Sequence, residues 1–116
     1  MHEISFAQSI LKTIEESTDL SQVVSVDQIT ISIGTLSGVD PEALKTAFSL
    51  IPKPHAFTKV MLKVRTQPIV LFCDECDTES TIEDSFVLKC PSCKKRVHTI
   101  RKGEELEIDT IRCTYA

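Results

Sequence analysis

Four of the five cysteines form two closely spaced pairs, Cys73-x-x-Cys76 and Cys90-x-x-Cys93. Two residues between the cysteines of a pair let the chain turn so that both sulfur atoms point at one ion. Two such pairs supply four soft thiolates, the ligand set of a tetrahedral Zn²⁺ site. Because protein would fill all four positions around the ion, the predicted site is structural, since zinc catalysis needs an open coordination position.

The charged residues around these cysteines are segregated by sign. Residues 74–84 include six acidic and no basic side chains, whereas residues 89–102 include six basic and no acidic ones. We predict that the two halves fold against each other as a compact ribbon, with the basic half also offsetting the net negative charge of a zinc–thiolate centre. A segment of this length cannot bury enough apolar surface to fold alone, so the metal must supply folding energy.

Other interpretations of the cysteine region stay open at this stage. One pair by itself could be a redox dithiol, and four cysteines could hold an iron–sulfur cluster. His98 could replace one cysteine as a ligand, and Lys94-Lys95-Arg96 could contact nucleic acid. Cys113 lies outside the paired pattern and is predicted to be a small buried apolar residue.

The elements that must position these residues follow from the spacing of apolar side chains. Intervals of three and four residues predict a helix over residues 4–14. Asp40-Pro41-Glu42 is a helix-start signature, and it predicts a second helix that ends near Ile51. Alternating apolar patterns predict strands over residues 29–33, 60–64 and 106–115, and residues 69–72 form a further apolar stretch. In the last strand the alternation changes phase, which predicts a β-bulge near Asp109-Thr110.

The composition indicates a folded protein and excludes several classes. The 116 residues are 41% apolar and 26% charged, and no apolar run approaches the ~20 residues of a membrane helix. The start of the chain lacks the features of a signal peptide, so we expect a cytoplasmic protein whose cysteines are metal ligands or free thiols. The net charge of -4 argues against general nucleic-acid binding. No catalytic set or phosphate loop is evident, so we do not expect an enzyme.

The first three residues, Met1-His2-Glu3, offer a second group of metal ligands. The α-amine, the imidazole and the intervening backbone nitrogens can wrap one ion, and an all-nitrogen set suits square-planar Ni²⁺ or Cu²⁺. All of these nitrogens must lose protons to bind, so affinity is expected to fall as pH drops. On composition alone, a solvated and frayed terminus is the simpler interpretation.

Further motifs occur together in one order along the chain. Met1-His2-Glu3 comes first, then residues 33–44 (IGTLSGVDPEAL), the two cysteine pairs, and residues 103–108 (GEELEI). In this order they resemble the HypA family of hydrogenase nickel-incorporation proteins along essentially the whole chain. Two features depart from the family: the sequence of residues 51–66, and Asp77 and Lys94, which stand where the family often has glycine after each cysteine pair.

The resemblance implies an α+β fold with two helices on a small three-stranded sheet and an inserted four-cysteine zinc ribbon. The nickel-binding domain is expected at residues 1–72 plus 103–116, and the zinc ribbon at residues 73–102. It also implies a nickel metallochaperone that carries Ni(II) as cargo for [NiFe]-hydrogenase maturation and holds structural Zn(II). The expected partners are a HypB-type GTPase and the hydrogenase large-subunit precursor, with urease maturation proteins in some members. The alternative is a zinc-ribbon module that binds protein or nucleic acid and has no nickel function.

The family's nickel site uses the chain terminus. Carried over to this sequence, the Met1 amine, the His2 imidazole and the backbone nitrogens of His2 and Glu3 would hold the ion. The Glu3 carboxylate and Asp40 would be additional or supporting ligands, as in some members. Asp40 also has an ordinary role as a helix cap, which its own sequence context predicts.

Overall fold

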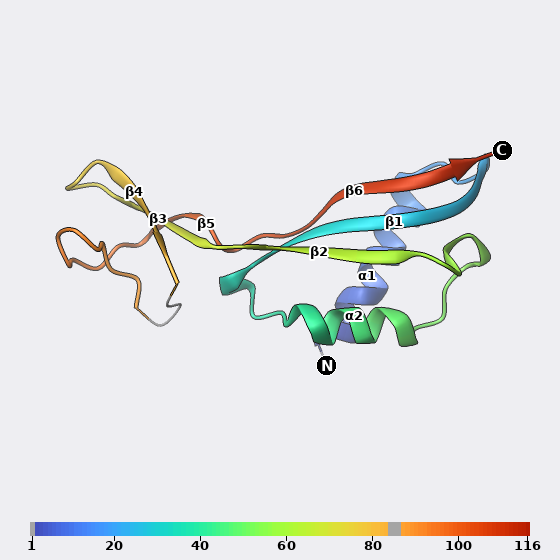
Figure 1. The fold of residues 1–116 in the computed structure, drawn as a ribbon, viewed down its shortest axis with the longest axis horizontal. Coiled ribbons are helices and arrows are strands. Elements are labelled where there is room, and N and C mark those ends of the chain that lie inside the picture. The colour runs from blue at the N-terminus through green and yellow to red at the C-terminus, as the bar shows by residue number, and fades with distance from the viewer. Residues whose placement is uncertain (1, 84–86) are drawn as a thin grey trace. The chain divides into compact units, whose positions relative to one another are not determined.

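The computed structural model describes residues 2–83 and 87–116, and of His2 the backbone only. Contacts divide the chain into two compact units: the first comprises residues up to Ile31, Val39–Arg65 and Glu107–Ala116, and the second comprises Ser32–Gly38 and Thr66–Leu106. The elements in chain order (Figure 1) are α1 (His2–Ser17), β1 (Val23–Gly34), η1 (Thr35–Ser37), α2 (Pro41–Leu50), η2 (His55–Phe57), β2 (Met61–Gln67), β3 (Ile69–Cys73), β4 (Thr78–Ile82), β5 (Thr99–Lys102) and β6 (Leu106–Tyr115).

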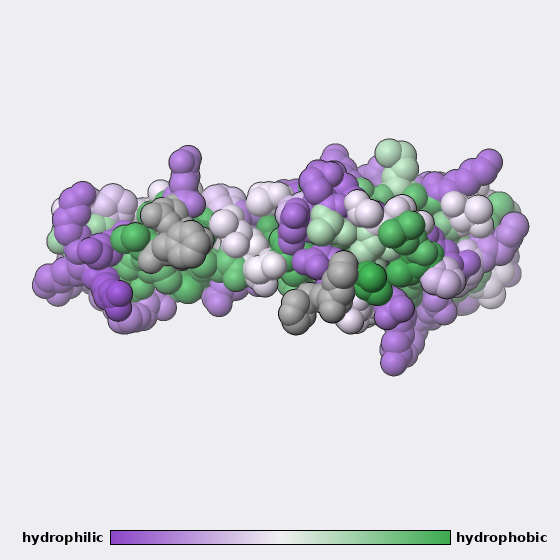
Figure 2. Space-filling model, turned by 90° about the horizontal axis from the view of Figure 1, so that it is seen from below, coloured by the Kyte–Doolittle hydropathy of each residue, from purple (hydrophilic) through white to green (hydrophobic). Residues whose placement is uncertain are grey.

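The two helices of the first unit pack against each other and lie on the same side of the sheet (Figure 1). Their apolar faces are the ones that the spacing predicts, with Ile10 and Ile14 buried on α1 and Leu44 and Phe48 buried on α2. Helix α2 begins as expected, because the Asp40 carboxylate accepts a hydrogen bond from the Glu42 backbone N–H at 3.0 Å. On this side, apolar residues reach the surface in patches among polar side chains (Figure 2).

The sheet that these helices cover has the strand order β2-β1-β6. Its central strand, β1, buries Ile29 and Ile31, and Phe57 of η2 is completely buried. A side-chain bond also links β6 to β1, because the Asp27 carboxylate accepts a hydrogen bond from the Thr114 hydroxyl at 2.6 Å. Within β1, the same carboxylate accepts a second hydrogen bond from the Ser25 hydroxyl at 2.7 Å. These hydroxyl donors lower the pKa of Asp27, with Thr114 making the larger contribution.

The second unit contains a separate antiparallel sheet with the order β4-β3-β5. Strand β3 is central and pairs with β4 from Ile69↔Ile82 to Cys73↔Thr78, and with β5 through Leu71↔Ile100. The buried cluster of this unit is small and includes two of the cysteines: Ile69, Leu71, Cys73, Cys90 and Val97. Part of its stability must therefore come from something other than apolar burial.

Two glycines allow a close backbone approach within the second unit. The Gly34 N–H donates to the Glu105 carbonyl at 2.7 Å, and the Leu36 N–H donates to the Gly103 carbonyl at 2.7 Å. A Cβ atom on Gly34 would collide with the Gly103 carbonyl, and Gly103 itself has a φ of +120°. Glycine at both positions is thus required by the geometry.

The predicted fold class is confirmed: two helices, a three-stranded sheet and a separate ribbon that carries four cysteines. Strand β1 begins at Val23, earlier than the predicted 29–33, and no pattern predicted β4 or β5. Strand β6 is continuous, and its half-buried residues Ile108, Ile111 and Cys113 show the same change of phase as the sequence. No helix in residues 2–83 and 87–116 is both long and apolar enough to cross a membrane.

Candidate metal centre

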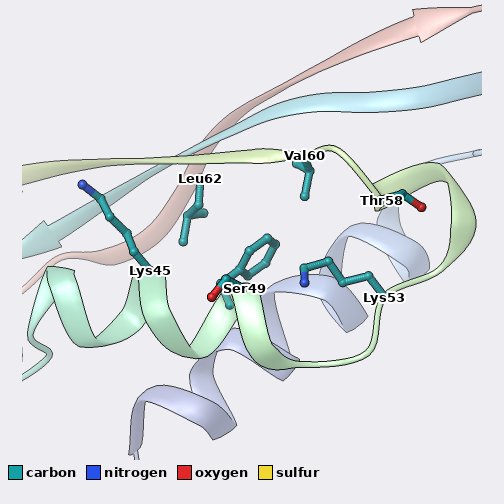
Figure 3. A pocket seen from close by; sticks show the side chains of 7 residues that line it. Lys45, Ser49, Lys53, Thr58, Val60 and Leu62 are labelled. Atoms are coloured by element: carbon teal, nitrogen blue, oxygen red, sulfur yellow. The ribbon is translucent and has the colours of Figure 1, made fainter.

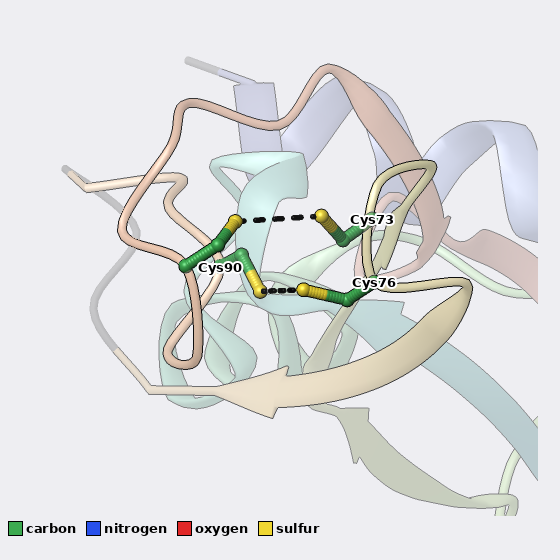
Figure 4. A group of neighbouring side chains, drawn as sticks. Cys73, Cys76 and Cys90 are labelled. Carbon is green, nitrogen blue, oxygen red and sulfur yellow. Dashed lines mark hydrogen bonds between the residues drawn. The ribbon is translucent and has the colours of Figure 1, made fainter.

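The four paired cysteines come together as one compact group (Figure 4). The sulfur atoms of Cys73 and Cys93 lie 3.7 Å apart, those of Cys76 and Cys90 lie 3.8 Å apart, and all four lie within 4.8 Å of one another. A Zn–S distance of about 2.3 Å separates tetrahedral ligands by about 3.8 Å. The arrangement therefore fits one zinc ion, and it leaves no room for a cluster of several metal ions.

Each cysteine pair is set by a short turn. Cys73 is the last residue of β3, and the turn that contains Cys76 leads into β4. In the second pair, the Lys94 N–H donates to the Cys90 carbonyl at 2.9 Å, and the Cys90 N–H donates to the Lys95 carbonyl at 3.0 Å. These backbone bonds turn the chain back on itself, so that both sulfur atoms of the pair face the same point.

The residue after each cysteine pair has an unusual backbone conformation. Asp77 has a φ of 52° and Lys94 a φ of 65°, a left-handed region that favours glycine. These are the two positions where the sequence departs from the family's glycines. Both turns form with Asp77 and Lys94 in place. Their left-handed backbone costs more conformational free energy with these side chains than it would with glycine.

The electrostatics of the four thiols favour a cation. Backbone N–H groups of Cys93 and Ser92 donate to the Cys90 sulfur and lower the pKa of that thiol to about 6. A hydrogen bond with Cys90, and further ones with Cys73 and Cys93, raise the pKa of Cys76 to about 12. Four thiolates held this close together would also repel one another. A divalent ion in the centre would remove that repulsion.

Oppositely charged side chains meet across the ribbon, as the segregated charges predict. The Lys95 ammonium lies 2.6 Å from both carboxylate oxygens of Glu75, and Arg101 lies 3.9 Å from Glu79. The Arg101 guanidinium also lies 4.6 Å from the centre of the Phe72 ring. Both ion pairs are exposed, so each contributes little to stability. Each joins a residue of the acidic segment to a residue of the basic segment.

The structure also bears on the other interpretations of the cysteine region, such as a ligand role for His98 or a disulfide between paired cysteines. His98 is exposed and is not part of the ligand group found among the described residues. The cysteines there are free, and sulfur separations of 3.7 and 3.8 Å are far from a disulfide bond of about 2.05 Å. Cys113, expected to be buried, is only half-buried.

The structure describes only some of the residues predicted to bind nickel. Met1 and the side chain of His2 lie outside the described residues. Glu3 is half-buried in the first turn of α1, and Asp40 caps α2. Both helices belong to the first unit and contact each other.

A small α+β unit joined to a ribbon with four convergent thiols defines the class of zinc-ribbon metal-binding proteins. The sequence model of one family, described as "Hydrogenase/urease nickel incorporation, metallochaperone, hypA", matches residues 1–113. The chain therefore belongs to the HypA family of nickel metallochaperones.

Individual proteins agree with this assignment. The chain is 28% identical to the hydrogenase maturation factor HypA of Shewanella baltica, over 91% of this chain and 90% of that protein. It is 33% identical to the guanidine hydrolase-activating protein A of a Synechocystis species, over the full length of both. Its fold is similar to the solution structure of the nickel metallochaperone HypA from Helicobacter pylori, with a TM-score of 0.67, 19% identity and 98% coverage of each chain.

Proposed function

We propose that the chain binds Ni(II) at its N-terminus and delivers it to the precursor of a nickel enzyme. The observation that carries the proposal is the family match over residues 1–113 in a chain that begins Met1-His2-Glu3. The proposed ligands are the Met1 amine, the His2 imidazole and the backbone nitrogens of His2 and Glu3.

The start of α1 supports the use of backbone nitrogens as ligands. Helix α1 begins at His2, and the first N–H groups of a helix have no partner within the helix. The nitrogens of His2 and Glu3 can therefore bind a metal without breaking a hydrogen bond of the helix. A site at the chain terminus is also open to ligand exchange, which a carrier needs in order to release its ion.

Asp40 is proposed as a supporting group for the same site. Its carboxylate oxygen Oδ1 caps α2, and a carboxylate has a second oxygen that can face an ion or a ligand. Asp40→Asn separates the two roles, because asparagine caps a helix about as well as aspartate but carries no charge. A loss of nickel affinity without a loss of stability in this variant would support the nickel role.

The test of the central proposal is a nickel titration by calorimetry and absorbance on zinc-loaded protein with its native start. We expect one Ni²⁺ per chain with a planar-site spectrum, lost both in His2→Ala and in a protein with extra residues before Met1. Affinity should fall between pH 7.5 and 6.0, because the amine and imidazole have reference pKa values of about 8 and about 6.5. Equal binding by all three proteins would refute the terminal site.

We propose that Cys73, Cys76, Cys90 and Cys93 hold a structural Zn(II). When bound, this ion supplies charge neutralisation and cross-links the two turns of the ribbon. With four protein ligands it has no open position for a substrate, so we also propose that the chain is not an enzyme. Zinc binding would thus belong to residues 73–102 and nickel binding to residues 1–72 plus 103–116, a functional division that stays a prediction.

The family's role in hydrogenase or urease maturation suggests which proteins the chain meets. We propose a HypB-type GTPase and a hydrogenase large-subunit precursor as partners in the cytoplasm, with urease maturation proteins as further candidates. Copurification with tagged chain from cells grown with nickel tests each of them. Salt-dependent RNA binding together with normal nickel-enzyme activity in a deletion strain would favour the zinc-ribbon module instead.

A second recipient is suggested by one comparison. The relative that matches the full length of both chains, at 33% identity, is a guanidine hydrolase-activating protein. A guanidine-degrading enzyme is therefore a candidate recipient beside hydrogenase. Deleting the gene and measuring hydrogenase, urease and guanidine hydrolase activities in the same strain would identify the recipient, as the activity that falls and that added nickel restores.

A further inference from the structure

The first unit has a pocket that neither metal site uses. It has a volume of about 280 Å³ and lies between α2 and the segment that leads into β2 (Figure 3). Val60 and Leu62 point down into it from the strand side, and Phe48 of α2 also lines it. Sites for whole small molecules are about 300–1,000 Å³, so this pocket suits one or two side chains of a larger partner.

Lys45 and Lys53 lie at opposite ends of this pocket, the Lys53 nitrogen turned inward and the Lys45 nitrogen turned outward (Figure 3). Lys53 is fixed in place, because its ammonium donates to the Ile51 carbonyl at 3.1 Å and lies 5.3 Å from the centre of the Phe48 ring. An ammonium has three donors, so two remain for a ligand. Lys45 lies 3.5 Å from Glu42, whose side chain is 82% exposed, and an ion pair this open is easily exchanged.

The other polar groups at the pocket do not offer donors. The Ser49 hydroxyl donates to the Thr46 carbonyl at 2.7 Å, and the Thr58 hydroxyl donates to the His55 carbonyl at 2.6 Å. The two ammonium groups are therefore the available donors among the polar groups that line the pocket. An apolar floor between two cations is complementary to a ligand that joins an aliphatic group to carboxylates.

The neighbouring strand gives such a ligand a backbone to pair with. Strand β2 is at the end of the order β2-β1-β6, so one of its edges pairs with no other strand in the described part of the chain. Lys63 on this strand is exposed, whereas the Arg65 guanidinium pairs with Asp109 at 3.5 Å, so Lys45 and Lys53 supply the positive charge at the pocket. An extended peptide added to a sheet edge gains main-chain hydrogen bonds, and pockets for its side chains give specificity.

We propose that this pocket binds an acidic segment of a partner protein, which pairs with the free edge of β2, places an aliphatic side chain over Phe48 and sets its carboxylates against Lys45 and Lys53. None of the residues that line the pocket belongs to the cysteine group or to Met1-His2-Glu3. The proposal therefore does not depend on which metal enzyme the chain serves.

The test uses ¹⁵N-labelled, zinc-loaded full-length chain titrated with two capped pentapeptides. One is acetyl-Asp-Glu-Leu-Glu-Asp-amide, and the other is its neutral counterpart, acetyl-Asn-Gln-Leu-Gln-Asn-amide. We expect the acidic peptide to shift the amide signals of Ser49, Thr58 and Leu62, and to bind at least tenfold more tightly than the neutral one. Its affinity should also fall as salt rises from 50 to 300 mM.

Variants assign the effect to the two lysines. Lys45→Gln with Lys53→Gln should reduce the affinity for the acidic peptide to that for the neutral one and leave the nickel titration unchanged. The matched control is Lys12→Gln, which removes the same kind of charge from an exposed position on α1 and should have no effect. Equal binding of both peptides, no salt dependence in the native chain, or shifts confined to the ribbon lysines would overturn the proposal. So would a concentration-dependent dimer that the double variant abolishes, since the occupant would then be a second copy.

Discussion

The two compact units of this chain are stabilised in different ways. The first unit buries a continuous set of apolar side chains from two helices, the sheet and η2. Among the described residues of the second unit, the buried cluster has five members, and two of them are the cysteines Cys73 and Cys90. In the first unit the core is independent of any ligand, whereas in the second the predicted metal ligands are part of the core. We therefore expect the two units to respond differently to the same kinds of change.

The largest expected difference comes from removing one of the four proposed zinc ligands. Cys90→Ser should abolish zinc binding and disorder the ribbon, because structural zinc supplies on the order of 10 kcal/mol to domains of this kind. Amide signals of β3–β5 should lose their dispersion in NMR spectra, while those of β1 and α2 stay in place. Cys113→Ser is the control and should retain one zinc per chain. Well-dispersed ribbon signals in the metal-free variant would show that the apolar cluster suffices.

A core substitution in the first unit should have the opposite pattern. Phe57 is completely buried, so Phe57→Ala should lower the free energy of unfolding by about 3–5 kcal/mol without changing zinc stoichiometry. The chain has one tyrosine, Tyr115 on β6, and no tryptophan, so tyrosine fluorescence during urea unfolding reports on this unit. Leu50→Ala is the control, because Leu50 is 75% exposed and its truncation should cost little. A similar loss in both variants would contradict the assigned core.

A smaller change should strengthen the ribbon. Lys94 adopts a left-handed conformation, so Lys94→Gly should stabilise the zinc-loaded ribbon by about 1 kcal/mol. We expect zinc loss to a chelator to slow by about fivefold. Lys95→Gly provides the contrast, because Lys95 has no positive φ and its ammonium pairs with Glu75. Lys95→Gly should therefore lose zinc faster than the native chain. If both glycine variants lost zinc more slowly, the flexibility of glycine, and not the left-handed φ of residue 94, would control the rate of zinc loss.

The smallest expected effect is a pH dependence confined to the first unit. The lowered pKa of Asp27 means that its carboxylate stabilises the folded state above its ordinary pKa of about 3.9, and that this contribution is lost as pH falls through the lower folded value. Asp27→Asn should thus lower the melting temperature at pH 6 by a few degrees at most, and the difference should shrink as pH falls below about 3.9. Tyr115 fluorescence melts across this range measure it, and a constant difference would point to geometry instead of charge.

The contrast between the units also explains what the sequence could predict. The helices follow from regular apolar spacing, and the metal centre follows from the spacing of Cys73, Cys76, Cys90 and Cys93, because in both cases local pattern and local structure coincide. Strands β4 and β5 were not predicted, since a small cross-linked ribbon needs few apolar residues and shows no clear alternation. No sequence pattern pointed to Lys45 and Lys53 either, because the pocket exists only once α2 and β2 are brought together.

The interaction between Asp27 and Thr114 is a further case that sequence cannot supply. The two residues are 87 positions apart, and each has an ordinary role as a polar strand residue. Their pairing depends on the order β2-β1-β6, which places the last strand beside the first. Topology, and not local preference, thus determines which polar side chains become partners.

The position of the ribbon in the chain has a consequence for the rate of folding. The chain leaves the first sheet after Gln67 and returns at Leu106, and strands β3 and β5 pair at Val70↔Lys102 near both ends of this excursion. Pairing there shortens the loop that must close before β6 can join β1. The entropic cost of closing a loop is smaller when the loop is shorter. Metal capture early in folding would therefore hasten the last strand's addition, so that cellular zinc supply sets how quickly the other unit is completed.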